Sequence, residues 1–470
     1  MSTQTDSADQ AKDTTTLQQD EQQTNVASFR RVLKNRNFLL LWLAQLISLT
    51  VFNAVNFGVI LLVTELTHSV FMIGLAIVSF TLPALPFGAV AGSIVDHLDK
   101  RFVLWVTNLL RMGTMVLIVV SLLTNRSSLW PLYVLSYMAS LIGQFFIPAE
   151  GSAIPLLVGE DDLLPALSLF NISITVSQAL GFLLLGRVVA TLFPPFTIFA
   201  LHVQSIDMLF VVSAVLYVVC AILILLIPLP AFHEQHSDVH FGKGTRIDMR
   251  QVFHTLWRDT VAGWRTIRVD PLLYYAVVQL SVVGIIMLLI GELAGTFVQQ
   301  VLHRPAADMS IILAPAAVGL IGASILMPHI TKRISMLRLT TLGFIVLALG
   351  FIALPASEWV AALFDPKHGA ESPLLVVVIV IIVLALGAAI ASVNIPTQTM
   401  MQERAPEESR ARVLAFQYML YSVGSIPVLL FAGVFAQFIG FDQLIVLLAV
   451  SLLLFCSWGV WYVKKYRKRG

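Results

Sequence analysis

Charged residues are scarce in this sequence of 470 residues. Asp, Glu, Lys and Arg make up 12% of the chain, hydrophobic residues make up 58%, and the mean hydropathy is +0.87. A soluble domain carries roughly 25% charged residues, so this chain has too little polar surface to be solvated by water alone. The composition therefore excludes an ordinary soluble protein and predicts that lipid covers most of the folded surface.

Several common functional signals are absent as well. The two cysteines, Cys220 and Cys456, lie within apolar runs, so no disulfide framework, metal site or other cofactor site is expected. No Walker A motif is present, which argues against ATP-driven transport. The net charge of +2 indicates no nucleic-acid partner. Residues 1–37 begin with a Gln-, Thr- and Ser-rich stretch that lacks the apolar core of a signal peptide, and they are predicted to form a disordered polar tail.

Long apolar runs dominate the rest of the chain. A membrane-spanning helix needs roughly 20 apolar residues. Twelve runs meet that length: 38–65, 70–95, 102–124, 130–157, 164–191, 209–228, 272–300, 309–328, 335–357, 373–402, 411–437 and 441–463. They predict an all-α membrane protein with twelve transmembrane helices, in an N-terminal half (38–228) and a C-terminal half (272–463), followed by a basic tail at 464–470.

The distribution of Lys and Arg predicts the orientation. Of the 29 Lys and Arg residues, all but five lie on one side of the predicted spans. Arg126, Arg304 and Lys367 lie in the opposite loops, whereas Arg111 and Arg187 fall within runs. The positive-inside rule places the rich side, with both termini, in the cytoplasm. An even number of spans is required for this arrangement, and twelve satisfies it.

The two halves also resemble each other. Lys100-Arg101 follows the second run and Lys332-Arg333 follows the eighth, while Ile147-Pro148 and Ile395-Pro396 occupy the fourth and tenth runs. Two six-helix pseudo-repeats predict a central cavity at their interface. The segment 229–271 between them has apolar residues at helical spacing with interleaved arginines, which predicts a cytoplasmic linker with an amphipathic helix on the membrane surface.

The loop after the second run reads Gly92-Ser-Ile-Val-Asp96-His97-Leu98-Asp99-Lys100-Arg101. Gly88 and Gly92 are four residues apart, so they share a helix face and are expected to let a neighbouring helix approach closely. Asp96 could pair with a cation or a helix N-terminus across the interface between the halves, in one conformation only, and so act as a latch for the outward-facing state. Alternatively, Asp96, Lys100 and Arg101 are solvated charges that only fix the topology.

This loop resembles the signature loop of the major facilitator superfamily, with His97 and Asp99 departing from the usual Arg and Gly. Its form is similar to the macrolide-efflux and enterobactin-exporter-like branch. Three further stretches resemble that branch: Phe145-Phe-Ile-Pro148-Ala149, Gly263-Trp264-Arg-Thr-Ile-Arg268 and Gln402-Glu403-Arg404-Ala-Pro406. The resemblance implies a major facilitator fold and export of small organic molecules driven by an ion gradient, usually of protons.

Three charged residues stand out within predicted spans: Arg111, Glu150 and Glu292. A charge at mid-membrane costs about 2.5 kcal/mol or more, so it usually faces a partner or an internal cavity. Arg111 and Glu150 lie in consecutive runs and could form an ion pair, either structural or part of a substrate or proton site. Glu292 has no evident partner. It would either carry a proton, bind a cation or face water outside the membrane.

Uncharged polar residues in two runs are further candidates. Gln45, Asn53 and Asn56 lie in the first run, where Asn53 and Asn56 share a helix face. Asn171 and Gln178, seven residues apart, share a face of the fifth run. These side chains either line the cavity and bind a ligand or form hydrogen bonds to neighbouring helices.

The combined prediction is a secondary active transporter that works by alternating access. We expect a proton-driven exporter of small lipophilic molecules, such as drugs or siderophore-like compounds, acting as a monomer in the plasma membrane. The expected partners are the substrate, protons or another coupling ion, and the lipid bilayer. A lipid or lysophospholipid flippase and an importer of the same fold remain alternatives, as does a membrane enzyme or scaffold that transports nothing.

Overall fold

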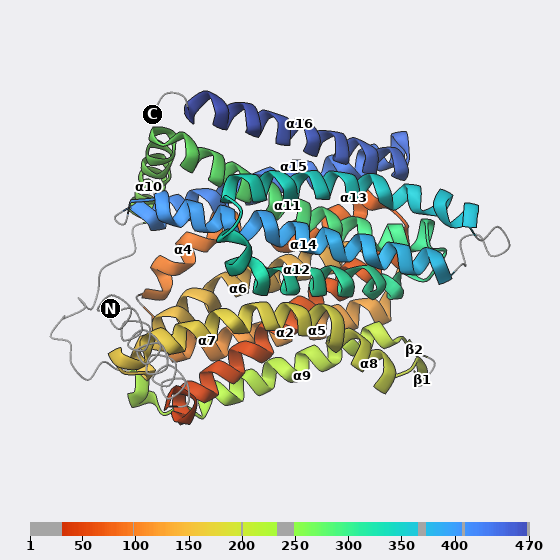
Figure 1. Cartoon of the computed structure of the whole chain (residues 1–470). Helices are drawn as coiled ribbons and strands as arrows, with labels where there is room; N and C mark the ends of the chain where they lie inside the picture. The colour runs from red at the N-terminus through yellow and green to blue at the C-terminus, as the bar shows by residue number, and fades with distance from the viewer. Residues whose placement is uncertain are drawn as a thin grey trace, which may run out of the picture.

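The structure is a computed structural model that describes residues 31–96, 98–198, 201–232, 249–364, 373–406 and 409–467. Most of the predicted N-terminal tail and the first part of the linker lie outside these residues. Helices form nearly all of what is described (Figure 1).

The N-terminal half consists of six consecutive helical segments. They are α2 (Arg36–Thr67), α3 (Val70–Thr81) with α4 (Ala84–Asp96), α5 (Lys100–Thr124), α6 (Trp130–Leu157), α7 (Glu160–Ala179) with η1 (Leu180–Leu185) and α8 (Gly186–Leu192), and α9 (Ser205–Leu225). The second segment is interrupted at Leu82-Pro83, because proline cannot donate the backbone hydrogen bond that a continuous helix requires. The fifth is continuous but contains a widened π-helical turn, η1.

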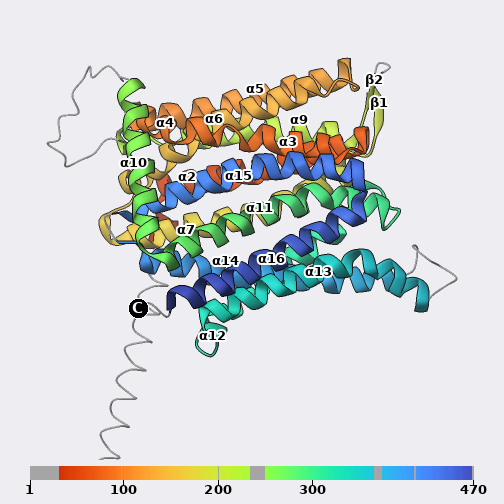
Figure 2. The ribbon, with the colours of Figure 1, turned by 90° about the horizontal axis from the view of Figure 1, so that it is seen from above.

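The C-terminal half also has six segments. They are α11 (Pro271–Gln300), η3 (Ala306–Met309) with α12 (Ser310–Thr331), α13 (Met336–Phe364), α14 (Pro373–Arg404), α15 (Arg410–Ile439) and α16 (Phe441–Arg467). The short turn η2 (Leu229–Phe232) and α10 (Met249–Val269) lie between the halves. Figure 2 shows α10 running across the ends of the long helices.

Eleven helices of the described chain are long and apolar enough to cross a membrane, and they account for every predicted run except 164–191. That run falls on α7, η1 and α8, which lie alongside the other helices (Figure 1). Its helix begins with three acidic residues, Glu160, Asp161 and Asp162, which lower its hydropathy. The predicted all-α membrane architecture of two six-helix halves is confirmed, with one small addition described below.

Local capping explains where individual helices begin. The Asn35 side chain accepts hydrogen bonds from the backbone N–H groups of Asn37 and Phe38, and Asp270 does the same for Leu272 and Leu273 at the start of α11. These side chains replace the missing intrahelical acceptors of a first turn. Capping also explains why α9 starts at Ser205, four residues before the predicted run. The sequence window counted apolar residues and missed the capping box formed by Gln204 and Asp207.

All long helices have one end at a common face of the bundle, which we call the termini side because the described chain starts and ends there (Figure 1). The opposite face is the far side. The loop between α8 and α9 on the far side contains a hairpin of β1 (Phe196–Ile198) and β2 (Leu201–Val203), which the sequence did not predict.

The two halves meet along a seam in which α3 packs against α15, α2 and α3 against α11, and η1 against α12. On the far side the seam is tight: a Cβ on Gly433 would overlap the backbone of Phe71. His68 hydrogen-bonds to Gln299 (3.1 Å), and the Gln437 amide donates to Ser69 Oγ (2.9 Å). Within the described part of the chain, the structure shows these two side-chain hydrogen bonds between the halves. The structure is therefore closed at the far side.

Helix α10 belongs to the C-terminal half by its contacts. It packs on α15 and α11, and the Trp264 ring stacks on Phe416 at a centroid distance of 5.3 Å. Arg258, Arg265 and Arg268 are exposed on it, whereas Ile267 is fully buried. The helix is thus amphipathic and lies against the termini side of the bundle.

Asp207 anchors the far-side loops of the N-terminal half. Its carboxylate is fully buried, accepts two hydrogen bonds from Arg126 (3.0 and 2.9 Å) and accepts a third from the backbone N–H of Gln204. Removing one partner of a buried ion pair leaves the other charge uncompensated, so Asp207→Ala should destabilise the protein by about 3 kcal/mol in thermal unfolding of detergent-solubilised protein.

Asp308→Ala is the matched control for this substitution. Asp308 pairs with Arg304 at 3.9 Å, and both side chains are more than 40% exposed, so its loss should cost less than about 1 kcal/mol. Equal losses in the two variants would contradict an anchoring role for Asp207.

Candidate substrate and coupling sites

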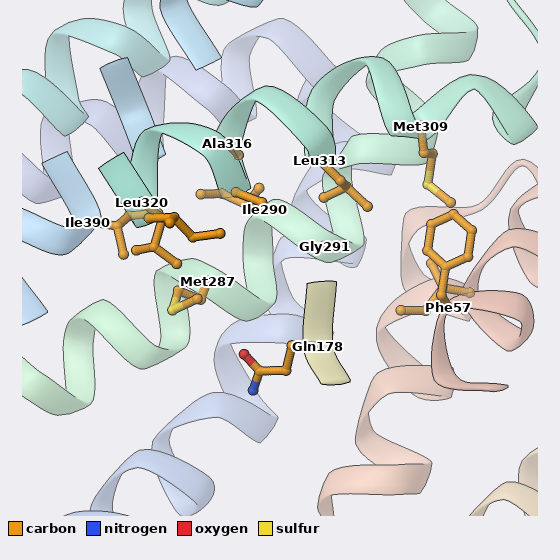
Figure 3. Close-up of a pocket in the computed structure, with 13 residues that line it drawn as sticks. Phe57, Gln178, Met287, Ile290, Gly291, Met309, Leu313, Ala316, Leu320 and Ile390 are labelled. Carbon is orange, nitrogen blue, oxygen red and sulfur yellow. The ribbon is translucent and has the colours of Figure 1, made fainter. Parts of the chain in front are cut away.

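A cavity of about 200 Å³ lies in the seam between the two halves. The N-terminal half contributes Phe57 and Ile60 of α2 and Gln178 of α7, while α11, η3, α12 and α14 form the other wall. Figure 3 shows apolar side chains from α11 and α12 facing Gln178 and Phe57. Gln178 is the one polar side chain among the lining residues. A mostly apolar cavity with few polar groups is typical of small-molecule sites.

Helical periodicity explains the apolar wall. Ile290 and Gly291 lie three and four residues after Met287 along α11, so all three lie on one face of that helix. The lining residues of α12 repeat in the same way: Leu313, Ala316, Ala317, Leu320 and Ile321. Sequence inspection missed this wall because every span is rich in such residues, so nothing in the sequence distinguishes a cavity face from a lipid-facing one.

The N-terminal wall depends on the π-helical turn η1, which begins two residues after Gln178. A Cβ on Gly181 would lie 2.6 Å from Asn53 Cβ and 2.6 Å from the Thr50 carbonyl oxygen, so the turn packs directly on α2. π-helical turns occur frequently at functional sites. This one sets the position at which α7 presents Gln178 to the cavity.

The three polar candidates of the first run do not line this cavity. The Gln45 amide donates to the Phe170 carbonyl (3.4 Å) and joins α2 to α7. The Asn53 amide donates to the Leu49 carbonyl of its own helix (2.8 Å), and Asn56 is buried within α2. The side chain of Asn171 lies outside the described set. Of the four candidates whose side chains the structure describes, Gln178 alone reaches the cavity wall.

Arg111 lies inside the N-terminal half and is only 3% exposed. Its guanidinium donates to Ser48 Oγ (3.1 Å) and lies over the rings of Phe52, Phe146 and Tyr217, at 5.5 to 5.7 Å from their centroids. Each cation–π contact stabilises a desolvated cation. A Cβ on Gly143 would overlap Nη2 of Arg111, so glycine at this position makes the room that the guanidinium occupies.

The ion pair suggested for Arg111 and Glu150 is not formed. Among the described residues no ion pair joins the two side chains, and Glu150 Oε1 has no hydrogen-bond partner although the residue is only 2% exposed. The aromatic rings and Ser48 hold Arg111 instead. Both residues lie within the N-terminal half and neither lines the seam cavity.

Glu292 of α11 lies at the seam itself and is fully buried. Neither carboxyl oxygen has a hydrogen-bond partner in the described structure, and Thr296 Oγ1, one turn further along, also has none. A Cβ on Gly74 of α3 would lie 2.6 Å from Glu292 Oε1, so the carboxyl group packs directly against the other half. Glu292 therefore does not face bulk water.

The loop after the second segment has a largely structural arrangement in this state. Asp99 caps α5 by accepting from the Phe102 N–H (2.7 Å). The Lys100 ammonium donates to the Val95 carbonyl (2.7 Å), and Arg101 donates to the Leu225 carbonyl of α9. These cationic side chains therefore donate hydrogen bonds to carbonyl groups in the last turns of α4 and α9, where carbonyl groups have no donor within the helix. The side chain of Asp96 and residue 97 lie outside the described set.

The close approach predicted from Gly88 and Gly92 is not found. A Cβ on Gly88 would lie 3.5 Å from Gln144 Oε1, and one on Gly92 would lie 4.0 Å from Pro148 Cβ. These are ordinary van der Waals distances, so α4 and α6 pack without requiring glycine at either position. The two glycines do share a helix face, as predicted. Their spacing alone, however, could not predict the distance to the neighbouring helix α6.

Two membrane-embedded helical halves that share an internal cavity define a polytopic transporter architecture. The family model of the Major Facilitator Superfamily matches residues 41–427, and the chain belongs to this family of membrane transporters.

Similar proteins agree with this assignment. An uncharacterised MFS-type transporter of Bacillus subtilis, YfiS, is 23% identical over 366 residues, which cover 78% of each chain. Macrolide efflux protein A of Streptococcus pyogenes is 26% identical over 151 residues, or 31% of this chain and 37% of that protein. The crystal structure of the nucleoside transporter NupG (D323A mutant) superimposes with a TM-score of 0.68 at 12% identity, covering 91% of this chain and 99% of that one. At this identity, the structural similarity shows the fold alone.

The room that Gly143 leaves for Arg111 can be tested by adding a methyl group. Gly143→Ala should displace the guanidinium from its aromatic rings and lower the thermal stability of the purified protein by about 2 kcal/mol, as overpacking does. Gly113→Ala, where nothing lies within 4 Å of the added carbon, should change stability by less than about 0.5 kcal/mol. Equal thermal stability of the two variants would show that the Arg111 guanidinium can move to another position without cost.

Proposed function

We propose that the protein is a secondary active exporter of small lipophilic organic molecules, driven by the proton gradient. The observation that carries this proposal is the seam cavity, because both halves line it and a change in their relative position would change access to it. The far side is closed in this structure, which corresponds to one of the two states that alternating access requires.

The chemistry of the cavity supports a lipophilic substrate. Its walls are apolar, and the thioethers of Met287 and Met309 can adapt to different shapes. The Gln178 amide can donate and accept hydrogen bonds and would orient a bound molecule through a single polar group. Export is favoured by the similarity to a macrolide efflux protein over about a third of the chain.

Proton coupling is supported by the buried carboxyl groups of Glu150 and Glu292, each of which has at least one oxygen without a hydrogen-bond partner in the described structure. Such groups can take up and release a proton within the membrane. We further propose that the termini side faces the cytoplasm of a plasma-membrane protein, because the predicted Lys and Arg excess lies there.

Transport can be measured with purified protein in proteoliposomes, using a macrolide and a panel of lipophilic dyes in both orientations of the proton gradient. We expect movement of at least one probe against its gradient, lost on addition of an uncoupler. Ala317→Trp should fill the cavity and reduce transport by about tenfold or more, equivalent to about 1.4 kcal/mol of binding. Transport that is independent of proton gradients would contradict the coupling.

Val318→Trp is the matched control. Val318 neighbours Ala317 on α12, is 60% exposed at the outer surface of the helix and does not line the cavity. This variant should transport normally. Equal loss in both variants would indicate a general disturbance of α12, and accumulation of the probe in the opposite direction would indicate an importer.

The loop after the second segment gives a separate test of gating. We propose that Asp96 latches the halves on the cytoplasmic side in the outward-facing state, with Gly88, Gly92, Lys100 and Arg101 shaping its helix and loop. Asp96→Asn should then impair turnover several-fold while leaving thermal stability unchanged. Wild-type turnover in this variant would leave the loop with only a topological role.

A further inference from the structure

The environment of Glu292 differs from that of Arg111, which with Glu150 is also a charged residue buried within the helices of the described structure. The aromatic rings and Ser48 surround Arg111, whereas both oxygens of Glu292 lack a hydrogen-bond partner in the described structure. Thr296, four residues on and so on the same helix face, presents a second polar oxygen without a partner. A fully buried carboxyl group in this setting is costly when ionised and is accommodated when neutral.

The position of Glu292 links it to closure of the seam. Gly74 of α3 lies against Oε1, and a Cβ there would also lie 3.0 Å from the Leu429 carbonyl of α15. The carboxyl group therefore sits where α3 of one half meets α11 and α15 of the other. One turn towards the far side, the Gly433 and Phe71 backbones are in contact. Opening the far side would separate α3 from α15 and expose Glu292 to water.

In the described structure, no charged side chain near Glu292 offsets the free-energy cost of burying its ionised carboxyl group. The adjoining α3 has no titratable residue, and α11 itself has only Tyr274 and Tyr275 near the termini side. The other elements packed against α11 carry the following titratable groups. At the far side are Glu65 and His68 of α2, Asp308 of η3 and Asp442 of α16. At the termini side are Arg36 of α2, His329 of α12, Glu403 and Arg404 of α14, Arg410 and Arg412 of α15, Lys464, Lys465, Tyr466 and Arg467 of α16, and Arg250, His254, Arg258, Asp259, Arg265 and Arg268 of α10. Between these ends are Tyr418 and Tyr421 of α15 and Cys456 and Tyr462 of α16.

A proton suits this site better than a metal ion. Calcium, for example, takes six to eight oxygen ligands. In the described residues, no group of three or more His, Cys, Asp and Glu side chains could hold a metal. A proton requires only one oxygen, and Glu292 supplies two.

We infer that Glu292 is the coupling site, at which one proton taken from water on the far side permits the far side of the seam to close. This inference rests on the proposed proton-driven function and specifies its site. With the far side open, a carboxylate oxygen accepts a proton from water, and the neutral carboxyl group is then buried against Gly74. Release of that proton to water on the termini side, as proton-driven export requires, leaves a buried anion without a partner, which favours reopening.

The test measures closure directly in the full-length protein, reconstituted in lipid nanodiscs. Spin labels on Ser127→Cys and Gln443→Cys report the distance between the halves at the far side, since both positions are exposed and both native cysteines are buried. Raising the pH should shift wild-type protein from short to long distances. A closure that binds one proton changes its equilibrium constant by up to about tenfold per pH unit.

Glu292→Gln mimics the neutral carboxyl group and should keep the short distance at every pH. Glu65→Gln and His68→Gln should respond to pH as the wild type does, because neither group lies at the buried contact. His68 does hydrogen-bond to Gln299 across the seam, and glutamine at this position can keep a hydrogen bond there. A pH response retained in Glu292→Gln, or lost in His68→Gln, would overturn the assignment.

Gly74→Ala provides a second test that does not alter the carboxyl group. Its methyl would occupy the place of the Glu292 carboxyl, so the long-distance population should rise at every pH relative to Gly113→Ala. An unchanged distance distribution would contradict the packing argument. Exchanging sodium for choline at constant pH should change nothing, and a sodium-dependent shift would overturn the choice of the proton.

These measurements need no substrate, so they separate the two proposals. A protein whose far side opens with pH through Glu292 but which moves none of the probes supports this inference and contradicts the proposed substrate class. A protein that transports a probe while its far-side distance is independent of pH contradicts this inference alone.

Discussion

The cost of removing an ionisable group from water constrains every polar residue inside this bundle. Arg111 is stabilised by three aromatic rings and by the Ser48 hydroxyl, and Gly143 leaves the space that this arrangement needs. Asp207 is stabilised by Arg126. Glu292 has neither kind of partner, and it lies where two mobile parts of the family's architecture meet. The same physical cost fixes the structure in one place and, on the mechanism we propose, makes its closure depend on a proton in another.

Much of the fold could be predicted from the sequence because the membrane imposes simple rules on length and polarity. Runs of about 20 apolar residues are expected to be helices, since a single segment in lipid can pair its backbone N–H and C=O groups only as a helix. The fifth segment shows the limit of this rule. Its acidic start lowers its hydropathy and so gives it a weak compositional signal, although the run itself was recognised. The small hairpin of β1 and β2 lies between the apolar runs, where these rules give no information.

The site was less predictable because hydropathy does not report how a helix is rotated about its axis. Gln178 and Asn53 looked equivalent in sequence, yet one lines the cavity and the other bonds to its own helix. The partner of Arg111 was also missed. Consecutive spans suggested Glu150, but aromatic rings can also stabilise a buried cation, and no spacing rule distinguishes such rings from the many that face lipid.

Helix α11 offers a physical route between substrate and proton. Gly291 lines the cavity, while the next residue, Glu292, packs against α3, because consecutive residues of a helix point about 100° apart. A rotation or tilt of α11 that reshapes the cavity must also move the carboxyl group relative to Gly74. Occupancy of one face and protonation of the other are then two influences on the same rigid element, and each must bias the other by an equal free energy. Both proposed sites, the cavity face and the Glu292 carboxyl group, lie on this one helix. Coupling between them therefore requires no chain of intervening residues.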